Sequence, residues 1–138
     1  MLRIRNLRQT TNMDEINKKI LIVEDDKSFL WILRQSLENE GFSVIFAQDG
    51  EEGLKMAEEE KPDLILLDIL LPKMDGITMA RKLKGKGIKS QIIFLTNLKD
   101  AEHISEAVEV VKETDYIIKS DLHIDQIVDR VKSRFNLK

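Results

Sequence analysis

The chain has 138 residues, enough for one domain with a real hydrophobic core, and its 42% apolar and 34% charged residues are ordinary for a soluble globular protein. A net charge of −3 argues against general nucleic-acid binding, and the absence of cysteine excludes disulfides, thiolate metal sites and thiol catalysis. No apolar run reaches membrane-spanning length and no signal pattern is visible, so the sequence predicts a cytoplasmic protein without membrane insertion.

The first eighteen residues differ from the rest of the chain. Arg3, Arg5 and Arg8 give the first part of this segment a positive charge, and the segment lacks the regular apolar pattern that follows. We interpret residues 1–18 as a flexible N-terminal extension that precedes one domain at residues 19–138. The alternative is a basic arm that contacts an acidic partner or a membrane surface.

From residue 20 onward, strand and helix patterns alternate five times. Short aliphatic runs predict strands at residues 20–23, 42–47, 64–68, 91–96 and 116–118. Apolar residues at helical spacing predict helices at residues 29–37, 51–60, 77–83, 101–111 and 124–135. Five strand–helix units in sequence predict an α/β fold with right-handed crossover connections.

The run from Leu64 to Leu67 is the most informative of these strands. It is unbroken, too short for a free-standing helix, and bounded by Pro62 and Pro72. Unbroken hydrophobicity indicates a strand that is covered on both faces, as in a parallel sheet between two layers of helices. Asp68 stands where this strand ends, and parallel sheets carry their chemistry at the carboxyl ends of strands.

Polar residues follow three other strands as well. Glu24-Asp25-Asp26 follows the first strand, Thr96 ends the fourth, and Lys119 follows the fifth. Because these loops share one edge of the predicted sheet, we expect the side chains to converge with Asp68.

Such a group has a coherent chemistry. Clustered carboxylates need a compensating cation to stay ionised, and oxygen-only ligands suit a hard ion such as Mg²⁺. A lysine can pair with a carboxylate or a phosphoryl group, and a threonine hydroxyl can donate to the same group. The pattern therefore indicates a carboxylate nucleophile that accepts a phosphoryl group with the help of Mg²⁺.

Each residue taken singly has an ordinary structural explanation. The acidic triplet could cap the first helix, Asp68 could form a turn, Thr96 could simply end a strand, and Lys119 could be a solvated charge. Their recurrence at the same edge of the sheet is what favours a functional site.

Four motifs resemble those of the response-regulator receiver domains of two-component signalling. They are Ile20-Leu-Ile-Val-Glu-Asp-Asp26, Pro62-Asp-Leu-Ile-Leu-Leu-Asp-Ile-Leu-Leu-Pro-Lys-Met-Asp-Gly76, Ile92-Ile-Phe-Leu-Thr96 and Asp115-Tyr-Ile-Ile-Lys119. The resemblance covers residues 19–135. It implies a flavodoxin-like (CheY-like) doubly wound five-stranded parallel sheet, (βα)5, with strand order 2-1-3-4-5.

The resemblance also implies a role for each site residue. Asp68 would be the phosphoacceptor, assisted by Thr96 and Lys119, and Thr96 and Tyr116 would be the switch residues. Asp25, Asp68 and the backbone carbonyl of Leu70 would bind Mg²⁺ directly, while Glu24 would act mostly through water. Asp26 would be an adjacent acid.

The resemblance implies protein partners rather than a small-molecule substrate. The phosphoryl donor would be a sensor histidine kinase or a histidine phosphotransfer protein. A downstream protein target would bind the surface formed by the fourth helix, the fifth strand and the closing helix. Because the chain ends about three residues after that helix, we expect no direct DNA binding, and a monomer or a phosphorylation-dependent dimer.

Some positions depart from the family pattern. Ser120 stands where a proline with a cis peptide usually follows the lysine, Asn97 replaces a small residue, and Lys112-Glu113 replaces small residues before the fifth strand. Apolar Leu70 and Leu98 stand two residues after Asp68 and Thr96. We hypothesise that neither can position an attacking water, so that an aspartyl phosphate would be long-lived.

Two other readings remain open, and a third is disfavoured. A pseudo-receiver would bind partners without phosphorylation, which Ser120 and Asn97 would suit. A small hydrolase with an aspartyl nucleophile would usually carry a second aspartate at the position of Leu70. Nucleotide or flavin binding is disfavoured because no glycine-rich phosphate loop follows the first strand, where Glu24 and the two acids beside it would repel a phosphate.

Overall fold

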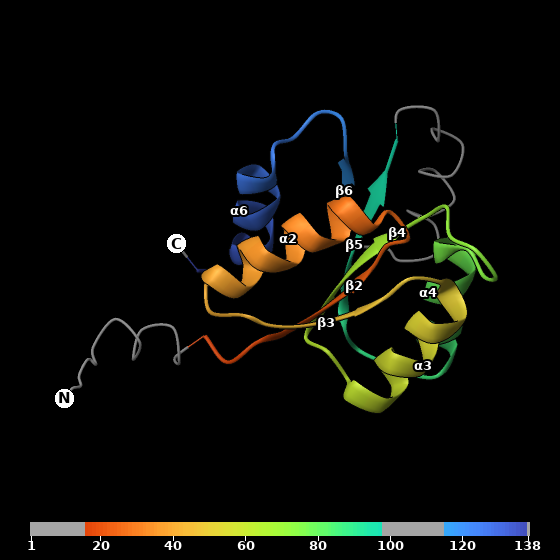
Figure 1. Ribbon diagram of the computed structural model, residues 1–138. Helices are drawn as coiled ribbons and strands as arrows, with labels where there is room; N and C mark the ends of the chain where they lie inside the picture. Colours follow the sequence, from red (N-terminus) through yellow and green to blue (C-terminus); the bar gives the residue numbers. More distant parts are fainter. Residues whose placement is uncertain (1–15, 98–114, 138) are drawn as a thin grey trace.

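The computed structural model describes residues 16–97 and 115–137, which contain five strands and four helices (Figure 1). The strands are β2 (Lys19–Val23), β3 (Ser43–Ala47), β4 (Leu64–Asp68), β5 (Gln91–Thr96) and β6 (Asp115–Ile118). The helices are α2 (Lys27–Asn39), α3 (Gly50–Glu60), α4 (Gly76–Gly85) and α6 (Ile124–Arg134). The helix expected at residues 101–111 lies outside the described residues.

The five strands form one parallel sheet in the order β3-β2-β4-β5-β6. Counted along the chain this is the order 2-1-3-4-5, so the predicted doubly wound, flavodoxin-like topology is confirmed. The register aligns Val23 with Leu67, Asp68 with Leu95, and Thr96 with Ile118. The strands therefore end close together along one edge of the sheet.

Helices cover both faces of the sheet (Figure 1). Helices α2 and α6 pack on one face, over a core that includes Ile20, Ile22 and Leu66. Helices α3 and α4 pack on the other face, over a core that includes Val23 and Leu67. Every residue of β4 is buried, as the unbroken aliphatic run predicted for a strand with both faces covered.

Three aspartates fix the helix starts that face the carboxyl edge of the sheet. Asp26, Asp49 and Asp75 are the N-cap residues of α2, α3 and α4, and each side chain accepts a hydrogen bond from a backbone N–H of the first turn. These caps fix the first turns of the helices that follow β2, β3 and β4.

The boundaries differ from the sequence prediction by one or two residues in several places. The second strand begins at Ser43 rather than at Phe42, because the Phe42 N–H donates to the carbonyl oxygen of Leu37 (3.2 Å) and closes the end of α2. The last strand begins at Asp115, which pairs in register with Ile93. Within the region assigned to the extension, Ile16 packs against the core under α2 and α6.

None of the helices within residues 16–97 and 115–137 is both long and apolar enough to cross a membrane.

Candidate functional site

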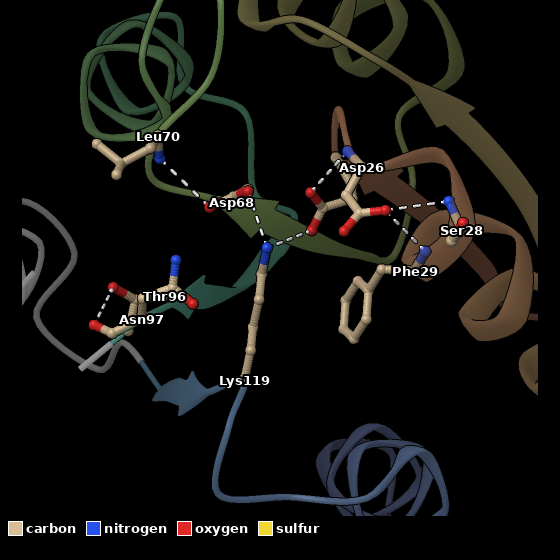
Figure 2. Close-up of polar contacts among 9 residues, drawn as sticks. Asp26, Ser28, Phe29, Asp68, Leu70, Thr96, Asn97 and Lys119 are labelled. Carbon is tan, nitrogen blue, oxygen red and sulfur yellow. Dashed lines mark hydrogen bonds and ion pairs between the residues drawn. The ribbon is translucent and has the colours of Figure 1, made fainter. Parts of the chain in front are cut away.

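Polar side chains from four segments meet at the carboxyl edge of the sheet (Figure 2). Glu24 follows β2, Asp68 ends β4, Thr96 ends β5 and Lys119 follows β6. Glu24 and Thr96 are 0% exposed and Asp68 is 7% exposed, although the surrounding loops face solvent. Buried groups of this kind are unusual and need partners, which the neighbouring strand ends supply.

Three carboxylates form a cluster at this edge. One oxygen from each of Glu24, Asp25 and Asp68 lies within 4.8 Å of the others, and Asp25 is the exposed member of the group. The structure thus brings together three of the residues that the sequence predicted as metal ligands. Like charges at this separation repel one another unless a cation lies near them.

Lys119 provides one such positive charge. Its Nζ atom lies 2.7 Å from Oε1 of Glu24 and 3.0 Å from Oδ2 of Asp68, to which it donates a hydrogen bond. The Lys119 N–H also donates to the carbonyl oxygen of Thr96 (2.8 Å), which ties the loop after β6 to the end of β5. The side chain is only 16% exposed, so these ion pairs are partly shielded from solvent.

The lysine reaches its partners although Ser120 follows it. The described residues contain no cis peptide bond, so the chain passes from Lys119 to Ser120 through a trans bond. The Asp121 N–H then donates to the carbonyl oxygen of Ile118 (2.9 Å), which closes a turn after β6. Ser120 therefore does not remove the lysine's charge from the site.

Burial and charge shift the pKa values of two groups. Burial, followed by the nearby Asp68 carboxylate, raises the pKa of Glu24 from 4.5 to about 7, although Lys119 and the Asp26 N–H act in the opposite direction. Burial lowers the pKa of Lys119, but its contacts with Glu24 and Asp68 outweigh this effect, and the pKa lies above 10.5. Lys119 therefore stays cationic, and this one lysine faces a cluster of three carboxyl groups.

The acidic residues fit a bound cation. Oε1 of Glu24 is buried and, within the described part of the chain, has no hydrogen-bond partner beyond its charge contact with Lys119. Exposed Asp25 stands at the solvent side of the same cluster. An oxygen-only ligand set without histidine or cysteine suits a hard divalent cation, and these three carboxylates could hold one.

The acidic triplet after β2 divides into two roles. Oδ1 of Asp26 accepts hydrogen bonds from the N–H groups of Ser28 (3.1 Å) and Phe29 (3.2 Å), so this residue caps α2. The Asp26 N–H in turn donates to Oε2 of Glu24 (3.1 Å). The capping explanation is thus right for Asp26, whereas Glu24 and Asp25 belong to the carboxylate cluster.

The loop after β4 holds Asp68 in place. The Ile69 N–H donates to the carbonyl oxygen of Leu95 (3.2 Å), and the Leu70 N–H donates to Oδ1 of Asp68 (3.3 Å). The Gly76 N–H donates to the carbonyl oxygen of Ile69 (2.8 Å), and a Cβ atom at Gly76 would collide with the Asp68 carbonyl oxygen. The role of the Leu70 carbonyl as a metal ligand stays a prediction.

Thr96 and Tyr116 lie near this edge in different environments. The buried Thr96 hydroxyl donates to the carbonyl oxygen of Asn97 (3.3 Å). Tyr116 stands on β6, 40% exposed, and its carbonyl oxygen accepts from Arg130 (3.4 Å). Their switch roles, and any effect of Asn97 on the threonine, remain predictions. Lys112-Glu113 and Leu98 lie outside the described residues.

The sequence analysis missed one aromatic contact at the site. Phe29 begins the apolar pattern that predicted the helix at residues 29–37, and it packs against the core under α2 and α6. The Nζ atom of Lys119 also lies 5.1 Å from the centroid of its ring. An aromatic residue three positions after Asp26 was the available signal, but nothing in the sequence places it beside Lys119.

Comparison with known proteins identifies the class that this fold and site define. The family model of the response regulator receiver domain matches residues 20–132, so the chain belongs to this family. Such domains belong to two-component systems, accept phosphoryl groups, bind Mg²⁺ at an acidic pocket, and interact with histidine kinases or phosphotransfer proteins.

Individual relatives support the same assignment. The chain is 33% identical over 123 residues to sporulation initiation phosphotransferase F of Bacillus subtilis (strain 168), covering 89% of this chain and 98% of the relative. It is 51% identical over 87 residues to the alkaline phosphatase synthesis transcriptional regulatory protein PhoP of the same organism, covering 63% of this chain but 36% of the relative. This chain thus spans about a third of the length of PhoP.

A solved structure shows the same architecture. The response regulator receiver domain protein (CheY-like) from Methanospirillum hungatei JF-1 superposes with a TM-score of 0.79 and 30% identity, covering 87% of this chain and 94% of that one.

Proposed function

We propose that this chain is a phosphoacceptor, in which Asp68 takes a phosphoryl group from a phosphohistidine donor and the domain then alters a protein-interaction surface. The observation that carries the proposal is the position of Lys119, 2.7 Å from Glu24 and 3.0 Å from Asp68 beside the carboxylate cluster. This lysine bridges a buried acid and the acid at the end of the central strand, where it can offset charge on a phosphoryl group.

The chemistry is a direct displacement at phosphorus. A carboxylate oxygen of Asp68 forms the new bond to phosphorus, the bond between phosphorus and the imidazole nitrogen of the donor breaks, and the imidazole leaves with the electron pair. Lys119 offsets negative charge on Asp68 and on the incoming oxygens. The Leu70 N–H, which donates to Oδ1 of Asp68 (3.3 Å), fixes the orientation of the carboxylate.

We propose Mg²⁺ as the cation of this site, held directly by Asp25, Asp68 and the Leu70 carbonyl and by Glu24 mostly through water. When bound, Mg²⁺ supplies positive charge that screens the phosphoryl oxygens from the carboxylates. The cluster of three carboxylates, in which buried Glu24 and Asp68 lie beside the exposed Asp25, supports this assignment.

The partners follow from the same proposal. The donor is a sensor histidine kinase or a histidine phosphotransfer protein, and the output is contact with a downstream protein. Tyr116 on β6 and the adjacent helix α6 form the described part of the surface that we assign to this output, with Thr96 and Tyr116 as the residues that change on phosphorylation.

Intact-mass analysis tests the proposal most directly. Purified wild type, Asp68→Asn and the control Asp129→Asn are incubated with acetyl phosphate, with Mg²⁺ or with EDTA. We expect a gain of one phosphoryl group in wild type and in the control, which changes an exposed acid on α6. The gain should require Mg²⁺ and should be absent in Asp68→Asn.

Two outcomes would contradict the proposal. A gain that survives in Asp68→Asn would place the modification elsewhere. The absence of any gain in wild type, together with the absence of Mg²⁺ binding, would instead favour a pseudo-receiver that binds its partners without phosphorylation.

A further inference from the structure

The Lys119 ammonium group contacts an aromatic ring as well as two carboxylates. Figure 2 shows the side chain extending from the loop after β6 toward Asp68, with the Phe29 ring beside it. The Nζ atom lies 5.1 Å from the ring centroid while it contacts the carboxylates of Glu24 and Asp68 at 2.7 and 3.0 Å. A cation at this distance from an aromatic ring is attracted to the negative face of the ring.

Four contacts link Glu24, Asp26, Phe29 and Lys119 in a ring. Oε2 of Glu24 accepts from the Asp26 N–H (3.1 Å), and Oδ1 of Asp26 accepts from the Phe29 N–H (3.2 Å). The Phe29 ring lies beside the Lys119 ammonium, and this ammonium forms an ion pair with Oε1 of Glu24 (2.7 Å). The N-cap of α2 thus fixes the first helical turn, and with it the ring, relative to the buried acid.

We propose that Phe29 is a positioning residue, whose ring holds the Lys119 ammonium between Glu24 and Asp68. A lysine side chain has a flexible four-carbon stem and a strongly hydrated head, so water at its exposed part (16%) competes with the two carboxylates for the ammonium group. The loop that carries Lys119 continues with exposed Ser120 through a trans bond, so no proline ring restricts the backbone there. The aromatic ring, 5.1 Å from the Nζ atom, supplies a third contact that restrains the ammonium group.

This inference rests on the proposed phosphoacceptor function for its kinetic consequence. Without the ring, water competes for the ammonium group, and in a smaller fraction of the molecules the lysine contacts Asp68. Phosphoryl uptake should then slow at saturating donor, because the charge that assists the displacement is less often in place. The concentration of donor that gives half the maximal rate should change little, since Phe29 has no part in binding a small donor.

The kinetic test uses acetyl phosphate with Mg²⁺ and compares Phe29→Leu with Phe29→Tyr and Phe29→Met. We expect the maximal rate of phosphorylation to fall about 5–10-fold in the leucine and methionine variants and to stay within about twofold of wild type in the tyrosine variant. Trp31→Leu is the matched control, because it removes an exposed aromatic ring from the same helix and should leave the rate unchanged. Far-UV circular dichroism shows whether each variant is folded.

A small donor also separates this role from a docking role. Phe29 is half-buried near the surface, and a residue that only contacts a protein donor would not affect the reaction with acetyl phosphate. An equal loss of rate in the tyrosine variant, or no loss in the leucine and methionine variants, would overturn the proposal.

A second readout does not depend on phosphorylation. The ε-methylene protons of Lys119, assigned by comparison with Lys119→Arg, should be shifted upfield by the ring current of Phe29. The shift should persist in the tyrosine variant and disappear in the leucine variant. If wild type takes up no phosphoryl group, the proposed function fails while this shift still tests the geometry. A slow leucine variant that retains the shift would show that Phe29 acts other than through Lys119.

Discussion

At the scale of single residues, we expect Leu70 to affect how long a phosphoryl group stays on Asp68. Its side chain stands two residues after Asp68, is 48% exposed, and offers no donor or acceptor that could orient a water for attack on phosphorus. We therefore expect a long-lived phosphoprotein, and a lifetime about tenfold shorter in Leu70→Gln, whose amide can hold such a water.

The lifetime is measured by intact mass after the donor is removed. Leu70→Met keeps the position apolar and should decay at the wild-type rate. Equal lifetimes in all three proteins would mean that residue 70 does not control access of water.

At the scale of elements, the start of α4 sets the position of Asp68. Gly76 opens this helix against the Asp68 carbonyl oxygen, so a methyl group there forces the helix and the end of β4 apart. We expect Gly76→Ala to lower the free energy of unfolding by about 2–3 kcal/mol, as overpacking of a fixed backbone contact does.

The same helix provides the control. Gly85 ends α4, and a Cβ atom built there would meet nothing within 4 Å. Gly85→Ala should therefore be neutral or more stable by up to about 1 kcal/mol, because alanine favours helix. Urea unfolding followed by circular dichroism measures both changes, and similar values for the two variants would contradict the argument.

The elements also show how far a sequence can predict this structure. Strand β4 was placed at its observed bounds because an aliphatic run between prolines has few alternatives. The convergence of Glu24, Asp68 and Lys119 followed from parallel topology. The sequence does not predict which acid of the triplet Glu24-Asp25-Asp26 is buried, because all three suit either a helix cap or a cation site. The contact between Phe29 and Lys119 joins segments ninety positions apart, and local pattern carries no information about such pairs.

At the scale of the whole molecule, global stability should depend on pH through Glu24. The pKa of Glu24 is raised from 4.5 to about 7 by burial and by Asp68, so the folded state holds its proton to higher pH than the unfolded state does. The contribution of Glu24 to stability is therefore full below pH 4.5, falls as pH rises toward 7, and is constant above it. This prediction applies to protein kept free of divalent cations with EDTA.

Replacing Glu24 by its neutral isostere glutamine should remove the part of the pH dependence of stability that comes from this residue. The free energy of unfolding of Glu24→Gln, taken relative to that of wild type, should be about 2 kcal/mol higher at pH 8 than at pH 5.5, since one pKa unit is worth about 1.4 kcal/mol. Glu59→Gln, which changes an exposed acid on α3, should follow wild type at both pH values.

Mg²⁺ provides a second comparison at pH 8. Because a cation stabilises the ionised form of Glu24, saturating Mg²⁺ should raise the free energy of unfolding of wild type more than it raises that of Glu24→Gln. Parallel pH profiles for wild type and Glu24→Gln in EDTA would mean that the buried carboxylate is not what limits stability at neutral pH.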